Sequence, residues 1–146
     1  MLRKTLIASL AASLAVLVTG CYTLSVVNFC NGTRTSVRVK SSQTGQEIDV
    51  RPGAFKKLPH AGGDLIVTVP SRDQFVFSAV EPPALDVANA GYLAKGTSLF
   101  GPGKITLRVR LEANMQLYAL MPSSKAVDPA IKQPEGYPKP GRKVGE

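Results

Sequence analysis

The chain has 146 residues, is 44% hydrophobic and carries a formal net charge of +8. This length allows one domain and excludes a multidomain enzyme, a TIM barrel and a complete dinucleotide-binding fold. The hydrophobic fraction excludes a fully disordered chain. The positive charge is spread along the chain and favours anionic neighbours in general, without selecting among them.

Residues 1–20 have the organisation of a secretory signal peptide. Arg3 and Lys4 form a basic n-region that precedes an apolar h-region, residues 6–18, an order typical of exported proteins. As a helix, the apolar stretch 5–20 would be about 24 Å long, which is shorter than the roughly 30 Å hydrocarbon core of a bilayer. We therefore expect a helical signal peptide over 1–20 and not a permanent membrane span.

The segment Val18-Thr19-Gly20-Cys21 resembles the lipobox of bacterial lipoproteins. The resemblance implies cleavage before Cys21 and attachment of diacylglycerol and acyl chains, such as palmitate, to this cysteine. Two or more such chains anchor a protein stably. An Asp after the cysteine commonly signals inner-membrane retention, and Tyr22 stands there instead. The resemblance thus implies an outer-membrane lipoprotein facing the periplasm, while an ordinary secretory protein with a chance cysteine is the alternative.

The region from Thr23 to Met121 alternates short β-rich runs with turn signals. The runs predicted as strands are 24–30, 35–40, 46–50, 54–58, 65–69, 74–80, 105–111 and 116–121. Strands that recur about every 8–12 residues without intervening helical patterns are typical of an antiparallel sandwich or a small barrel. We expect an all-β domain over 21–121, a single antiparallel β-sandwich of about seven or eight short strands, immunoglobulin-like or transthyretin-like.

The dipeptide Asn31-Gly32 lies between two of these runs. Both residues accept positive φ, and such a pair between β-rich runs is a strong signal for a tight hairpin. The sequence therefore predicts that 24–30 and 35–40 pair with each other.

The clearest predicted strand is 105–111. Its odd-numbered residues are all branched aliphatics and should face the core, whereas Arg108 and Arg110 should face water. Together with Arg38 and Lys40, these arginines form a candidate contact surface. Nucleic acid is not an expected partner, because only 6% of the residues are aromatic and the chain carries an export signal.

Residues 122–146 differ from the rest of the chain. They have few apolar residues and no periodicity, and they contain Pro122, Pro129, Pro134, Pro138 and Pro140. Such a composition predicts a basic, disordered C-terminal tail. An arm that reaches an anionic or partner surface is the functional alternative.

Residues suited to catalysis are few. His60 lies in a Gly-rich loop and is expected to be exposed, while Cys30, the only thiol left if Cys21 is lipidated, is expected to be a small buried residue. These two form the sole conceivable Cys–His pair. Zinc, nucleophilic-serine and phosphate-loop motifs are missing, so we expect no catalytic residue, no metal and no cofactor.

These features predict a membrane-tethered periplasmic lipoprotein that acts as a non-catalytic binding or assembly module. Its expected partners are the lipid bilayer, through Cys21, and an envelope protein or peptidoglycan; exposed strand edges pair readily with other chains. The alternative is a small-ligand carrier or an envelope enzyme that uses His60, Cys30 and acidic residues. Convergence of His60, Cys30 and two carboxylates within about 5 Å would favour that alternative.

Overall fold

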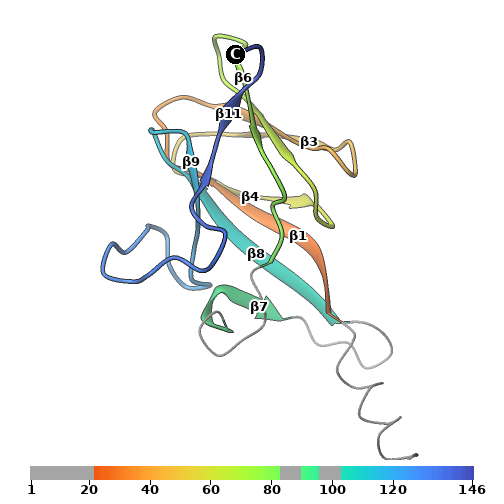
Figure 1. The fold of residues 1–146 in the computed structure, drawn as a ribbon, viewed down its shortest axis with the longest axis vertical. Helices are drawn as coiled ribbons and strands as arrows, with labels where there is room; N and C mark the ends of the chain where they lie inside the picture. Colours follow the sequence, from red (N-terminus) through yellow and green to blue (C-terminus); the bar gives the residue numbers. More distant parts are fainter. Residues whose placement is uncertain (1–21, 83–89, 96–102) are drawn as a thin grey trace, which may run out of the picture.

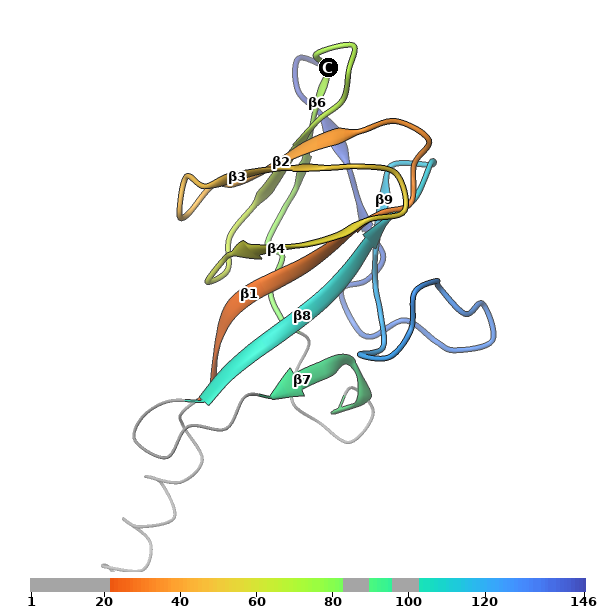
Figure 2. The ribbon, with the colours of Figure 1, turned by 180° about the vertical axis from the view of Figure 1, so that it is seen from behind.

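The computed structural model describes residues 22–82, 90–95 and 103–146, and strands dominate it (Figure 1, Figure 2). The one helical element in these ranges is a 3-10 turn, η1 (Ala90–Tyr92). The strands are β1 (Tyr22–Asn31), β2 (Val37–Ser41), β3 (Glu47–Val50), β4 (Phe55–Pro59), β5 (Leu65–Thr68), β6 (Gln74–Phe77), β7 (Leu93–Lys95), β8 (Gly103–Leu111), β9 (Gln116–Ala119), β10 (Lys139–Pro140) and β11 (Arg142–Lys143). None of the described helical structure is long and apolar enough to cross a bilayer.

The strands form two sheets. The first has the order β10-β9-β8-β1-β4, with β7 also paired to β8, and the second has the order β11-β6-β5-β2-β3. All pairs are antiparallel except β1 and β8, which run parallel from Tyr22 beside Gly103 to Asn31 beside Leu111. The prediction of an all-β fold with two sheets is therefore confirmed. The sheets are mostly antiparallel, where a wholly antiparallel sandwich was expected, and they have more strands than predicted.

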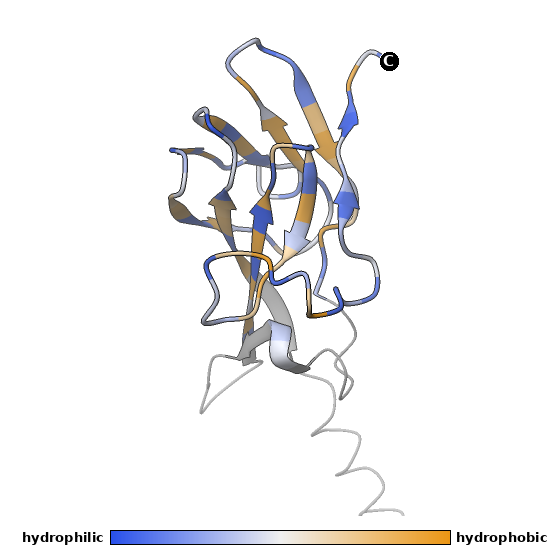
Figure 3. Cartoon of the chain, turned by 90° about the vertical axis from the view of Figure 1, so that its left-hand side faces the viewer, coloured by the Kyte–Doolittle hydropathy of each residue, from blue (hydrophilic) through white to orange (hydrophobic). Residues whose placement is uncertain are grey.

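The core lies between the two sheets, as the alternation of side chains requires. In β2, Val37 and Val39 are buried, whereas Arg38 and Lys40 are exposed. In β8 the four odd-numbered aliphatic residues from Ile105 to Leu111 are no more than 1% exposed, so the predicted core face of this strand is confirmed. Figure 3 shows the resulting hydrophobic bands along the strands.

The predicted hairpin at Asn31-Gly32 is wrong, because β1 and β2 belong to different sheets. The Asn31 side chain instead fixes a corner between the sheets. Its Nδ2 donates to the carbonyl oxygens of Thr35 at 2.8 Å and Val50 at 2.9 Å, and its Oδ1 accepts from the Thr33 backbone N–H at 2.9 Å. Local side-chain bonds of this kind compete with a hairpin turn.

Gly32 serves this corner through close packing, not through a left-handed backbone conformation. Its N–H donates to the carbonyl oxygen of Leu111 at 2.7 Å. A Cβ at Gly32 would lie only 2.5 Å from that oxygen. The glycine is therefore needed where the chain leaves β1 beside the end of β8.

Residues 122–146 are ordered, so the predicted disordered tail is wrong and the folded domain extends beyond residue 121. β10 pairs with β9 in the first sheet, and β11 pairs with β6 in the second. We call residues 139–143 the strap, because they cross from one sheet to the other at one side of the sandwich (Figure 1).

Polar groups and one buried aromatic residue hold this C-terminal segment. The Gln133 side chain takes the place of a neighbouring strand: its Oε1 accepts from the Ala119 N–H at 2.9 Å, and its Nε2 donates to the Ala119 carbonyl at 3.1 Å. Tyr137 is 9% exposed and packs with the core. The composition of residues 122–146 predicted disorder, but the contacts of Gln133 and Tyr137 hold the segment on the sandwich despite its low apolar content.

Candidate functional site

The two candidate catalytic side chains are far apart. Cys30 lies opposite Phe55 in the β1–β4 ladder, whereas His60 follows Pro59, which lies opposite Val26. Five residues of strand separate these positions, or about 17 Å at 3.4 Å per residue. Cys30 and His60 therefore do not form a dyad.

His60 is 1% exposed, so the prediction that it would be exposed is wrong. Its Nε2 lies 3.0 Å from the carbonyl oxygen of Val80, and its Nδ1 lies 2.8 Å from the Ser41 hydroxyl. A carbonyl only accepts, so Nε2 carries the proton and Nδ1 accepts from the hydroxyl. Burial lowers the pKa of His60, although backbone hydrogen bonds with Val80 and Gly63 and the charges of Asp64 and Glu81 oppose the shift. The imidazole is a neutral link between β2 and the segment after β6.

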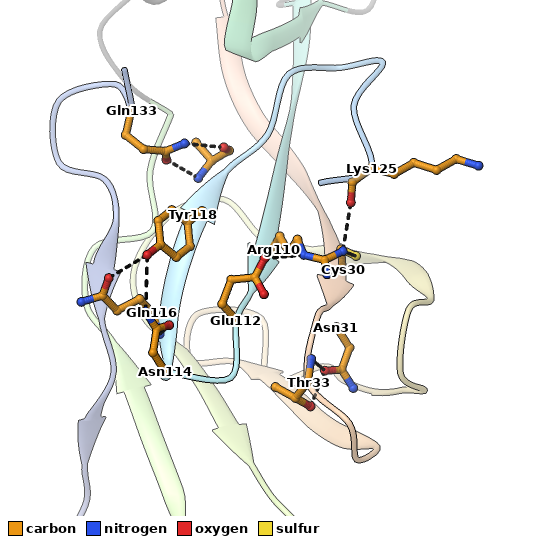
Figure 4. A network of polar contacts seen from close by, with 11 residues as sticks. Cys30, Asn31, Thr33, Arg110, Glu112, Asn114, Gln116, Tyr118, Lys125 and Gln133 are labelled. Atoms are coloured by element: carbon orange, nitrogen blue, oxygen red, sulfur yellow. Dashed lines mark hydrogen bonds and ion pairs between the residues drawn. The ribbon is translucent and has the colours of Figure 1, made fainter. Parts of the chain in front are cut away.

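Cys30 is fully buried, as predicted, and its side chain lies on the outer side of the first sheet. Arg110 Nη1 lies 3.5 Å from its Sγ (Figure 4). Burial raises the pKa of the thiol, and the Arg110 charge offsets only part of this effect. A raised pKa keeps the group protonated, which is the opposite of what a nucleophilic cysteine needs.

The four residues of the candidate contact surface do not come together. Arg38 and Lys40 lie on β2 of the second sheet, and Arg108 and Arg110 lie on β8 of the first. Both pairs alternate with core residues, so they lie on the two opposite outer faces of the sandwich. Strand β3 neutralises the first pair: Arg38 lies 3.0 Å from a carboxylate oxygen of Asp49, and Lys40 and Glu47 are 3.8 Å apart.

The C-terminal segment half covers the two arginines of β8. The Arg108 guanidinium lies 4.6 Å from the centre of the Phe55 ring and donates to the carbonyl oxygens of residues 121 and 122. Arg110 donates to the Lys125 carbonyl at 3.0 Å and to Glu112 at 2.6 Å (Figure 4). These side chains lie on the predicted face, but they hold a chain segment in place and do not simply face water.

Comparison with protein-family models, curated proteins and solved structures finds no match. The site must therefore be argued from the residues alone. Within the described ranges, no group of three or more His, Cys, Asp or Glu side chains is placed to hold a metal ion. Cys21, the predicted lipidation site, lies outside those ranges, and β1 begins at the next residue, Tyr22.

Strand β4 (Phe55–Pro59) was expected as a strand over 54–58, but its position at the edge of the first sheet was not predicted. The strap joins the sheets on one side, whereas on the other side β3 and β4 end them without a further strand among the described residues. A groove runs between these two edges, with Ser36, Asp49 and Val50 on one wall and Ala54, Phe55 and Lys56 on the other. Lys56-Lys57 within a β-rich run, followed by Pro59, is a sequence signal typical of an edge strand.

Proposed function

We propose that this protein is a lipid-anchored lipoprotein of the bacterial envelope that acts as a non-catalytic binding or assembly module. In this proposal Cys21 carries the acyl chains, residues 1–20 are the cleaved signal peptide, and the protein faces the periplasm from the outer membrane. An envelope protein or peptidoglycan is its partner. The sandwich is of the immunoglobulin-like or transthyretin-like type.

The observation that carries this proposal is the position of β1 directly after Cys21. β1 lies inside the first sheet, with β8 on one side and β4 on the other. A lipid on Cys21 would thus hold the sandwich by one of its inner strands, without a flexible spacer. β1 has 10 residues and is about 33 Å long at 3.3 Å per residue. Asn31 and the corner that it fixes would stand that far from the anchor.

The arrangement of reactive groups favours binding over the alternative of an envelope enzyme or a ligand carrier. The described carboxylates do not bring Cys30 and His60 together in one site: Glu112 on the Cys30 side is paired with Arg110, whereas Asp64 and Glu81 influence His60 through their charges. Two strand edges, in contrast, border the groove on one side of the sandwich. Strand edges and grooves are surfaces that extended segments of other proteins recognise.

Two measurements test the proposal. Palmitate labelling in bacteria that produce the full chain should disappear in Cys21→Ser and persist in the matched variant Cys30→Ser. A label that persists without Cys21 would refute the lipid anchor. Photo-crosslinkers at exposed positions of the anchored protein should give a discrete crosslinked species on one side of the sandwich, and crosslinking nowhere would refute a binding role.

A further inference from the structure

The outer edge of β4 presents unused backbone hydrogen-bonding groups. The Asn31 N–H donates to the Ala54 carbonyl at 3.1 Å, and in the same register Lys56 and Leu58 lie opposite Phe29 and Val27. Residues in an antiparallel pair alternate between bonding the neighbour and pointing away from it. Lys56 and Leu58 therefore bond β1, and the residues that alternate with them point their backbone groups outward.

The outward groups are the N–H and C=O of Phe55 and Lys57. In the described part of the chain no strand other than β1 pairs with β4. The edge has a defined end, because Pro59 lacks an N–H and its carbonyl accepts from the Thr44 hydroxyl at 3.1 Å. A partner strand thus finds two donors and two acceptors over residues 55–57.

The charge of this edge selects the partner. Lys56 and Lys57 are exposed, as is Arg51 in the turn before the strand. Among the described residues, no carboxylate lies within ion-pair distance of these three cations. The neighbouring edge, β3, differs because its acids Glu47 and Asp49 are already paired with cations of β2.

The lysines also decide against a second copy of this chain. Pairing β4 with itself would place lysines beside lysines, and like charges across neighbouring strands are destabilising. An inward-pointing charge such as Lys56 further protects an edge against indiscriminate pairing. An incoming strand with acidic residues would instead be attracted by these lysines. The same charges thus favour an acidic partner and disfavour a basic one.

We infer that the β4 edge, residues 55–59, is a strand-addition site for an extended acidic segment of an envelope protein. The inference rests on the proposed binding function and names its surface and the chemistry of its partner. Residues 55–59 lie beside Val26–Cys30 of β1. At 3.3 Å per residue, the edge would stand about 13–26 Å from Tyr22, within reach of a partner at the membrane surface.

The test uses the full chain in detergent and two eight-residue probe peptides, one of alternating Glu and Val and one of alternating Lys and Val. We expect the acidic peptide to bind and the basic one not to bind. The double variant Lys56→Glu/Lys57→Glu should bind the acidic peptide about tenfold more weakly. Lys56 and Lys57 point to opposite faces of the sheet, so the glutamates of the peptide, which share one face, meet a like charge in the variant whichever face they occupy. The control Lys132→Glu/Arg142→Glu, which reverses two exposed cations elsewhere, should bind as the unmodified chain does.

Amide hydrogen exchange of the unmodified chain locates the peptide without any variant. The amides of Phe55 and Lys57 should exchange fast in the free protein and slowly with the acidic peptide bound, while those of Lys56 and Leu58 should be slow in both states. Protection at Glu47 and Asp49 instead, or equal binding by the charge-reversed variant, would overturn the inference. If only the inference about β4 is wrong, peptide binding fails while labelling of Cys21 and crosslinking still succeed. If labelling and crosslinking fail while the acidic peptide still binds, only the proposed function is refuted.

Discussion

The hydroxyl of Tyr137 donates a hydrogen bond of 2.8 Å to the carbonyl oxygen of Glu81, 56 residues earlier in the chain. The ring is 9% exposed, and burial, with a smaller contribution from the Glu81 charge, raises the pKa of the phenol. This contact fastens the C-terminal segment to the loop that follows β6, immediately before the strap completes both sheets. The segment is therefore expected to contribute to the stability of the domain.

We predict that Tyr137→Phe lowers the free energy of unfolding by about 1 kcal/mol, the usual net value of one hydrogen bond. Tyr137→Ala should lower it by about 3–5 kcal/mol, because a buried aromatic ring is removed and a cavity is left. Urea denaturation followed by circular dichroism measures both values. Tyr118→Phe is the control, since the Tyr118 hydroxyl bonds only side chains of its own turn; unchanged stability in Tyr137→Ala would contradict the role of the segment.

We next predict that Gly141→Ala lowers the free energy of unfolding of the domain and loosens the strap. The backbone at Gly141 passes so close to the core that a Cβ would lie 2.8 Å from the Phe77 ring and 2.9 Å from the Met115 carbonyl oxygen. Overpacking of this kind costs about 1–3 kcal/mol. The amide of Val144, which donates to the Gln74 carbonyl at 2.9 Å, should then exchange faster. Pro140→Ala at the exposed neighbouring residue should change neither quantity, and equal effects of the two substitutions would show that packing at Gly141 is not limiting.

Much of the fold could be predicted because side-chain alternation is a local property of the sequence. Val37 and Val39 of β2 and the aliphatic residues of β8 reveal which face of each strand is buried. Gly45 and Gly53, which lie between strands, also follow a local rule, since their φ values of 72° and 73° are ones that glycine adopts readily. Local rules therefore found eight of the eleven described strands, and missed β7, β10 and β11.

The same local rules failed where a distant partner decides the conformation. The side-chain amide of Asn31 donates a hydrogen bond to the carbonyl oxygen of Val50. A glycine is needed at position 32 because the carbonyl oxygen of Leu111 leaves no room for a Cβ. Neither residue therefore forms the expected turn. Gln133 completes the edge of β9 through its side chain, a bond that composition cannot reveal. For the candidate site, the Lys56-Lys57 signal was present, but whether β4 is an edge strand depends on the pairing of the whole sheet.

We predict that Cys30 reacts slowly with iodoacetamide in the folded protein. The thiol is fully buried and its pKa is raised by burial, and alkylation requires the thiolate. The rate, followed by mass spectrometry, should rise strongly in denaturant. Truncation after Pro122 should also accelerate the reaction, because it removes the Lys125 carbonyl that accepts from Arg110 next to the sulfur and the strands β10 and β11 that stabilise the domain. Fast labelling of the intact native chain would show that Cys30 is an accessible, reactive thiol.

The last prediction concerns His60, the one histidine in the sequence. Burial is the main cause that lowers its pKa in the folded protein, so the folded state favours the neutral imidazole. The unfolded chain, with a histidine pKa near 6.5, binds the proton more readily. The contribution of His60 to the stability of the folded state is therefore fully present above about pH 6.5. It is lost as the pH falls from there toward the lower pKa that His60 has in the folded protein.

Urea denaturation of the full chain at pH values between about 7.5 and 5 measures this dependence. We expect the free energy of unfolding to fall over this interval in the unmodified chain and to stay nearly constant in His60→Gln, which keeps a donor for Val80 but does not titrate. The carboxyl group of Asp49, whose pKa is lowered by its hydrogen bond from Arg38, does not interfere because acids of this type lose their contribution only near or below about pH 4. A profile equally steep in both proteins would show that the buried imidazole is not the group that senses pH.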